Sequence, residues 1–461
     1  MSEQAKFLEG SLFKHISVMS LTASLGLMAV FLVDFVDMIF ISMLGKAELA
    51  AAIGYAGAVL FFTSSFSIGM SIASGALVAR ALGAGDEERA KRQATSTLII
   101  GIILASLFVG AVWIYAYEIT ALLGATDETL NLAVGYLRII IPSLPVLMVG
   151  MIGSAILRAH GDARRAMMAT IYGGLVNAIL DPILIFGLDL ELTGAAIASV
   201  CARFAIALTA IIPAIRVYQG IQKPQISQII PDLSPVMAIA FPAILTQLAT
   251  PIGSAYVTRT MATFGEEAVA GMAIVGRMTP VAFGVIFALS GAIGPIIGQN
   301  AGAGQDDRVR AAFREGLYFT AAVVVLVSLI LYLMRPFLVT LFELDGLALT
   351  LVFLFAGPLS LAFFFNGVIF VGNAAFNNLN HPYYSTWINW GRHTLGTIPF
   401  VMLGAAWAGA PGVLIGQSAG GLVFAVVTYV LAVRVMDKGE APEKDHFARE
   451  GRLHRLFHHR R

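Results

Sequence analysis

Three aspartates and one asparagine interrupt otherwise apolar stretches of this sequence, and they occur as two pairs. Asp34 and Asp37 are three positions apart in the first apolar stretch, and Asn177 and Asp181 are four positions apart in the fifth. On a helix, either spacing places both side chains on one face. Carboxylates beside a carboxamide at low dielectric can hold a proton or bind Na⁺, because burial and a second negative charge both favour a neutralised site.

Pro182 directly follows the second of these carboxylates. A proline inside a helix leaves one backbone carbonyl without its usual partner, so it can bend the helix or supply a further cation ligand. The competing interpretation is structural, with Asp37 hydrated near the outer interface and Asp181 capping or pairing locally. Ionisable groups at membrane depth are costly and usually face a protein interior or a water-filled cavity, so we favour a cation-coupling role.

The chain that must position these residues has the composition of a membrane protein. Of its 461 residues 58% are hydrophobic and 12% are charged, against about 25% charged in soluble domains. The apolar segments are long enough to cross a hydrocarbon core about 30 Å thick, and they lack the alternation of a β-barrel. Twelve helical spans are predicted, at about 15–43, 50–80, 94–117, 132–157, 166–187, 193–217, 235–262, 268–299, 312–335, 347–376, 384–405 and 410–436.

An internal repeat organises these spans into an all-α fold of two six-helix lobes around a central cavity. MLGKAELAAAIGYAG, from Met43 to Gly57, matches TFGEEAVAGMAIVGR, from Thr263 to Arg277, and LGAGDEERAKRQA, from Leu82, matches AGAGQDDRVRAAF, from Ala301. Six is an even number of spans, so the copies should be related by an axis along the membrane normal. We predict lobes at 1–217 and 236–436, a cytoplasmic linker at 218–235 and a polar tail at 437–461.

Positively charged residues predict the orientation in the membrane. One side collects Lys6, Lys14, Arg80, Arg89, Lys91, Arg92, Arg158, Arg164, Arg165, Arg216, Lys223, Arg308, Arg310, Arg314 and the tail, whereas the other offers chiefly Lys46, Arg259 and Arg335. The positive-inside rule therefore places both termini in the cytoplasm of a cell (inner) membrane. The first fourteen residues lack the features of a secretory signal, so we expect a mature N-terminus.

The sequence lacks the residues that several other classes of function require. No basic helix or aromatic groove suits a nucleic acid, and the single Cys201 offers neither a disulfide framework nor a cysteine metal site. The glycine-rich turns that begin at Gly83 and Gly302 do not continue into a phosphate-loop lysine, so we interpret them as helix stops. Of the remaining intramembrane polar residues, we expect the long side chains to reach toward the interfaces; these residues are Arg138, Arg203, Arg277, Arg392 and His393.

Together these motifs resemble those of the multidrug and toxic compound extrusion (MATE) family from about Leu12 to Met436. The resemblance is carried by VDMIFISMLGKAELAA (Val36 to Ala51), ARALGAGD (Ala79 to Asp86), YLRI (Tyr136 to Ile139), LRAHGDARRAM (Leu157 to Met167), VNAILDPILIFGLDLELTGAAIAS (Val176 to Ser199) and GQNAGAG (Gly298 to Gly304). It implies export of organic, often cationic compounds through a cavity that opens alternately to either side, driven by inward flow of H⁺ or Na⁺.

The resemblance also implies roles for particular residues. In similar prokaryotic members the first-span aspartate and the fifth-span Asn/Asp pair form the cation site, which here means Asp37, Asn177 and Asp181, with Tyr136 and Ser199 lining the same pocket. Asp34 is added to this site on its spacing alone. No cofactor is implied beyond the coupling ion, which is H⁺ or Na⁺, and no metal beyond a possible Na⁺ at the first three residues.

Two departures from the family pattern matter. The usual first-span proline is replaced by Thr22, although Pro242 occupies the repeat-equivalent position, so a mechanism based on a first-helix proline kink is in doubt. The segments Phe241 to Thr260 and Asn389 to Gly404 contain no Asp or Glu, which indicates the branch whose coupling carboxylates lie in the N-terminal lobe.

We therefore predict a secondary active exporter of small amphipathic or cationic compounds that works by antiport, with the lipid bilayer and small-molecule substrates as its partners and no obligate protein partner. One alternative is a flippase for lipids or lipid-linked oligosaccharides, which would need cations for a pyrophosphate where this sequence offers acids. An intramembrane enzyme is the alternative from another class. No nucleophile, metal cluster or cofactor loop accompanies the aspartates, so we predict that the chain is not an enzyme.

Overall fold

The computed structural model describes residues 5–438, apart from the side chains of Asp34, Met38, Ser42, Ala47 and Ala50. Within that range every regular element is a helix. The α-helices are α1 (Leu12–Met43), α2 (Ala47–Gly83), α3 (Glu87–Ile114), α4 (Ala116–Leu122), α5 (Asp127–Ile140), α6 (Leu144–Ala159), α7 (Ala163–Pro182), α8 (Glu191–Arg216), α9 (Ile226–Ala262), α10 (Glu266–Ala282), α11 (Gly284–Gly302), α12 (Asp306–Leu333), α13 (Arg335–Phe342), α14 (Gly346–Leu354), α15 (Ser360–Asn378), α16 (Pro382–His393) and α17 (Ile398–Asp437). A 3-10 turn η1 (Ile141–Ser143) and two π-helical turns, η2 (Ile183–Gly187) and η3 (Phe355–Leu359), join some of them. The predicted polar tail lies outside the described residues from position 439 onward.

The described helices supply eleven segments that are long and apolar enough to cross a membrane, and the last of them is two spans. That segment, Pro382–Asp437, has 56 residues, whereas about twenty suffice to cross a bilayer. Its backbone leaves helical geometry at Ala408 and Gly409, where φ is −138° and 63°. The chain folds back on itself there. The close approach of the two arms shows this, since a Cβ on Gly412 would lie 1.9 Å from the carbonyl oxygen of Gly404. The twelve predicted spans are thereby confirmed.

Several spans are broken helices and not continuous rods. The fourth span consists of α5, η1 and α6, the eighth of α10 and α11, and the tenth of α14, η3 and α15. Prolines lie in or beside these breaks, at Pro142, Pro280 and Pro358, because a proline removes one helical hydrogen bond. α1 has no such interruption. α9 begins at Ile226, so the latter part of the predicted linker, with Pro231 and Pro235, is helical.

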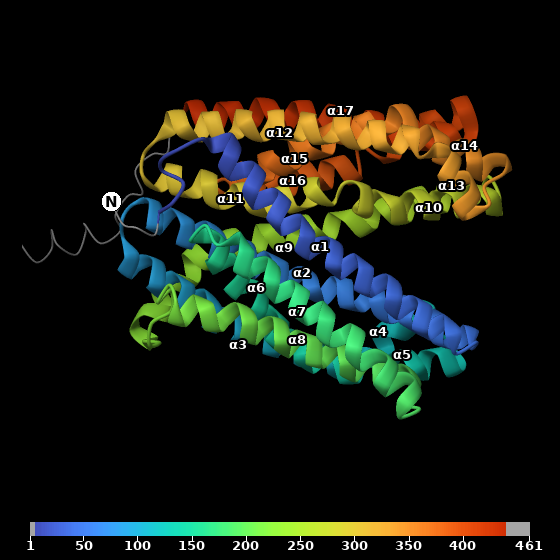
Figure 1. The fold of residues 1–461 in the computed structure, drawn as a ribbon, viewed down its shortest axis with the longest axis horizontal. Helices are drawn as coiled ribbons and strands as arrows, with labels where there is room; N and C mark the ends of the chain where they lie inside the picture. Colours follow the sequence, from blue (N-terminus) through green and yellow to red (C-terminus); the bar gives the residue numbers. More distant parts are fainter. Residues whose placement is uncertain (1–4, 439–461) are drawn as a thin grey trace, which may run out of the picture.

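The two halves of the chain meet through a small set of helices. α2 contacts α9 and α11, and α1 contacts α11. Figure 1 shows α2 to α8 and α10 to α17 as two groups that approach each other at the end where α1 begins and diverge toward the end that carries α5 and α13, with α1 running obliquely between them. We call these two ends the joined end and the splayed end.

Two glycines bring the backbones of α2 and α11 into contact at the joined end. A Cβ on Gly83 would lie 2.0 Å from the carbonyl oxygen of Gln299, and a Cβ on Gly302 would lie 2.0 Å from that of Arg80. Each glycine is the last residue of its helix. The glycine motifs therefore end helices, as predicted. They also allow the backbones of α2 and α11 to cross closely, because glycine has a hydrogen atom where other residues have a Cβ.

Buried amides of the GQN motif reinforce the joined end. Gln299 and Asn300 are fully buried on α11. The Gln299 amide donates to the Ala159 carbonyl oxygen at 2.7 Å and accepts from the Phe7 N–H at 2.9 Å. Asn300 Nδ2 donates to the Phe7 carbonyl oxygen at 3.2 Å. Side chains of the second half thus bind both the N-terminal segment and α6 of the first half.

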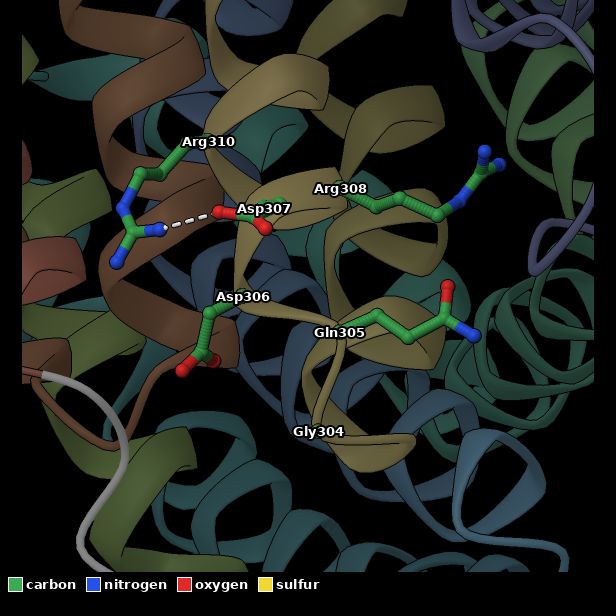
Figure 2. A pocket seen from close by; sticks show the side chains of 6 residues that line it. All are labelled: Gly304, Gln305, Asp306, Asp307, Arg308 and Arg310. Atoms are coloured by element: carbon green, nitrogen blue, oxygen red, sulfur yellow. Dashed lines mark hydrogen bonds and ion pairs between the residues drawn. The ribbon is translucent and has the colours of Figure 1, made fainter.

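A surface hollow lies beside the turn that follows α11 (Figure 2). It is lined by Gly304, Gln305, Asp306, Asp307, Arg308 and Arg310. Arg310 donates to Asp307 at 2.8 Å, and Arg308 donates to the Phe7 carbonyl oxygen at 2.9 Å. Arg308 therefore joins the second half to the N-terminal segment, whereas the Arg310 contact lies within α12.

The glycine crossing predicts that Gly83→Ala forces the joined end apart. Its Cβ would meet backbone and not a movable side chain, so α2 and α11 must separate. In a protein without Cys201, spin labels at Glu88 and Asp307 should report a longer distance in Gly83→Ala than in the parent. Gly110→Ala is the matched control, since a Cβ there meets nothing within 4 Å. An unchanged label distance in Gly83→Ala would show that the crossing does not hold this end closed.

Candidate functional site

The side chains of Asp37, Asn177 and Asp181 meet between α1 and α7. Asn177 Nδ2 donates to both carboxylate oxygens of Asp37, at 3.0 and 3.1 Å, and to Asp181 Oδ2 at 2.6 Å. Asp181 is 0% exposed and Asn177 is 4% exposed, whereas Asp37 is half-buried. The two carboxyl groups also interact directly with each other. Residues 140 positions apart in the sequence therefore form one cluster.

The charges of this cluster are not balanced by the residues that form it. The Asn177 amide has two N–H donors, yet three carboxylate oxygens lie within hydrogen-bonding distance of its nitrogen. Asp181 Oδ1 is buried and has no hydrogen-bond partner among the described residues. Two ionised carboxylates this close at low dielectric repel strongly. A shared proton or a bound Na⁺ would relieve this repulsion and would satisfy the remaining oxygen.

Features at both ends of α7 position Asn177 and Asp181. At its start Asp162 caps the helix by accepting from the Arg165 N–H at 3.0 Å, and it also accepts from the Tyr218 hydroxyl at 2.8 Å. At its end the helix passes through Pro182 into the π-helical turn η2. The predicted deviation at this proline is present, directly after the buried carboxylate. Such π-helical turns often occur at functional positions.

The Asp162 cap is an ionised carboxylate. Burial disfavours its charged form, but hydrogen bonds from the Arg165 N–H, the Tyr218 hydroxyl and the Arg165 side chain outweigh that penalty. They hold the pKa of Asp162 below its ordinary value of 3.8. The start of α7 is therefore fastened to the segment after α8 by a charge-assisted contact.

Tyr136 and Ser199 lie beside the cluster, on α5 and α8. The Tyr136 hydroxyl is close enough to Ser199, Arg203, Asp37 and Asp181 to interact electrostatically with them. Arg203 follows Ser199 by one helical turn, and its Nη1 donates to the Ile140 carbonyl oxygen and to Ser143 Oγ, both at 2.9 Å. The predicted neighbourhood of the two pocket residues is thus assembled from four helices.

The inward direction of Arg203 was not predicted from the sequence, from which its side chain was expected to reach toward an interface. The structure instead turns the guanidinium inward onto η1, where it meets a carbonyl oxygen and a hydroxyl. Its spacing of four residues from Ser199 was the available signal, since that spacing places both on one helix face.

The other predicted polar residues divide into three groups. Arg138 and Arg277 are exposed, and Arg138 lies over the ring of Trp113. Arg392 is directed to Asn366 and His393 is buried beside Thr250, so the expectation that both reach an interface is wrong. The side chain of Asp34 lies outside the described part of the structure, and its membership of the site stays a prediction.

One protein family matches most of this chain. Its sequence profile, described as MatE, matches residues 23–183 and 242–403. The two matched segments correspond to the two halves that the internal repeat predicts.

Among curated proteins, the chain is 30% identical over 434 residues to an FAD transporter of Shewanella oneidensis, covering 93% of this chain and 96% of that protein. It is 27% identical over 305 residues to the multidrug export protein MepA of Staphylococcus aureus, covering 65% and 67% of the two chains. Among solved structures, the MATE transporter VcmN of Vibrio cholerae in its bent form superimposes with a TM-score of 0.86 at 25% identity, covering 93% of this chain and 98% of that one.

The Asp162 contacts predict a specific acid dependence of stability. A carboxyl whose folded pKa is depressed stabilises the fold above its unfolded pKa, here 3.8, and loses that contribution as pH falls through the lower folded value. Asp162→Asn retains a cap acceptor without the charge. It should therefore be less stable than the parent at neutral pH and should lose less stability on acidification.

Thermal unfolding followed by tryptophan fluorescence, with the pH lowered from about 7 to about 3, measures this dependence. Asp189→Asn, at an exposed aspartate in the turn before α8, serves as the control for loss of one carboxylate. Parallel curves for Asp162→Asn and the parent would contradict a depressed pKa.

Proposed function

The chain belongs to the MatE family, the multidrug and toxic compound extrusion transporters, and on that premise we propose that it exports small amphipathic organic compounds by antiport against H⁺ or Na⁺. The observation that carries this proposal is the single Asn177 amide held between Asp37 and Asp181. Two unpaired carboxylates at membrane depth have a high free energy, so an ion that neutralises them is bound there. Such an ion is suited to act as the coupling ion.

The contacts of α1 suggest how such an ion could drive movement. α1 packs against α7, which carries Asn177 and Asp181, and it also packs against α11 of the second half. Binding of a cation between α1 and α7 would therefore change an element that both halves share. Coupling further requires that ion and substrate each bind the two arrangements of the halves unequally.

The orientation forms part of the proposal. The positive-inside rule assigns the joined end, with Arg80, Arg89 and Arg308, to the cytoplasm of the cell (inner) membrane. The arrangement of Figure 1 would then be closed toward the cytoplasm and splayed outward, with lobes at 1–217 and 236–436 and a linker between them. Since α1 is uninterrupted and has Thr22 in place of a proline, its movement would not depend on a proline kink.

The names of the relatives leave the charge of the substrate open. MepA is a multidrug export protein, and the Shewanella protein is an FAD transporter, so the two names point to different cargo. Both names are compatible with a small organic compound that makes apolar and polar contacts with its transporter. The acidic cluster of the first half suits a coupling cation and does not suit the pyrophosphate group of a lipid-linked oligosaccharide, which disfavours the flippase alternative.

Removing one carboxylate should uncouple transport from the ion gradient. In proteoliposomes we expect Asp181→Asn and Asp37→Asn to lower gradient-driven export of a fluorescent substrate about tenfold or more, the scale of a typical coupling free energy. Asp189→Asn is the matched control, because the same chemical change occurs at an exposed position. Separate H⁺ and Na⁺ gradients identify the ion. Undiminished gradient-driven export by Asp181→Asn would remove this carboxylate from the mechanism.

A further inference from the structure

A ladder of polar side chains joins α15 and α16 within the second half. Asn389 Nδ2 donates to Asn373 Oδ1 at 3.2 Å, and Ser385 Oγ donates to Asn377 Oδ1 at 3.3 Å. The next contact between the two helices is made by Arg392, which donates to Asn366 Oδ1. This row of polar contacts therefore ends at the guanidinium of Arg392.

Arg392 lies near the middle of its span. It is the eleventh residue of a span that begins at Pro382 and reverses at Ala408, which places it about 15 Å along the helix axis. Half of the hydrocarbon thickness is also about 15 Å. A guanidinium at this depth cannot be explained by snorkelling from a helix end, and arginine at membrane depth is a functional candidate by default.

No carboxylate accompanies this guanidinium. The sequence contains no Asp or Glu between Asp345 and Asp437, the stretch that includes α14 to α16 and nearly all of α17. In the described part of the chain the recorded partner of Arg392 is the neutral amide of Asn366. The free carbonyls at the end of α16 favour a cation there, yet they leave most of the five N–H donors of an arginine unused.

Part of the Arg392 side chain is exposed: the residue as a whole is half-buried. α16 packs against α9, and α9 in turn contacts α2 and α3 of the first half. Arg392 therefore lies on a helix next to α9, which is one of the helices that connect the two halves.

We propose that Arg392, oriented by Asn366, binds an oxyanion of the exported compound, either a phosphate or a carboxylate, so that the cargo is an amphipathic anion. A planar guanidinium matches both groups because it can donate two parallel hydrogen bonds. This inference rests on the proposed export function and specifies its substrate class. The second half then supplies the cation that recognises cargo, and the first half supplies the carboxylates that bind the coupling ion.

Three flavins test the inference, because they share one ring and differ in charge. Riboflavin carries no anionic group, riboflavin 5′-phosphate carries a phosphate, and 10-carboxymethylflavin carries a carboxylate. Each is titrated into the purified full-length protein in nanodiscs of zwitterionic lipid without any ion gradient, and the dissociation constant is read from fluorescence anisotropy. The parent should bind at least one of the two anionic flavins about tenfold or more tightly than riboflavin, and the preferred one identifies the oxyanion.

Arg392→Gln should abolish this preference by weakening the anionic flavin while leaving riboflavin unchanged. Arg392→Lys, which retains the charge without the planar fork, should give an intermediate preference and is decisive if the glutamine variant fails to fold. Arg434→Gln, an exposed arginine near the end of α17, is the matched control and should keep the full preference. Because no gradient is used, Asp181→Asn should also keep the preference even if it abolishes export, which separates this inference from the proposed function.

Three results would overturn the inference. Equal affinity of the parent for all three flavins would show that no oxyanion is recognised. An equal loss of riboflavin and anionic flavin in Arg392→Gln would show that the arginine only holds α15 and α16 together. A preference that survives in Arg392→Gln but is lost in Arg277→Gln would place the oxyanion at the exposed arginine of α10.

Discussion

One amide nitrogen lies within hydrogen-bonding distance of three oxygens from two carboxylates, and the proposed mechanism depends on that contact. Asn177 bridges Asp37 on α1 and Asp181 on α7, while one oxygen of the buried Asp181 has no partner among the described residues. Such a cluster is stable in a low-dielectric interior only when a proton or a cation compensates its charge. On the proposed mechanism, the position of α1 relative to α7 depends on the ion, and α1 also contacts α11 of the other half.

The contacts that join the two halves lie apart from the charged residues proposed to bind the ion and the cargo. At the joined end, glycine backbones cross and buried amides of α11 bind Phe7 and Ala159. The carboxylate cluster belongs to the first half, and the carboxylate-free Arg392 to the second. If both proposals hold, a compound bound between the halves would meet the carboxylates of the coupling site in the first half and the guanidinium of Arg392 in the second.

The sequence predicted what depends on local pattern. Hydropathy identified twelve spans, including the weakly marked reversal that occurs at Ala408 and Gly409, and spacing grouped Asn177 with Asp181. Contacts between distant segments could not be derived in the same way. Nothing in the sequence places Gln299 against Phe7, and the inward direction of Arg203 and Arg392 depends on acceptors, Ser143 and Asn366, that lie on other elements. Long polar side chains are therefore the residues for which hydropathy reasoning failed here, because their direction is decided by tertiary partners.

The central claim is that the ion at the Asp37, Asn177 and Asp181 cluster controls the arrangement of the two halves. The most direct test places spin labels at the exposed Glu128 and Glu343, at the splayed end, in a protein without Cys201, and follows their distance distribution as H⁺ or Na⁺ is titrated in nanodiscs. A shift between two populations is expected in the parent and none in Asp181→Asn. An equal shift in both proteins would show that the ion acts elsewhere.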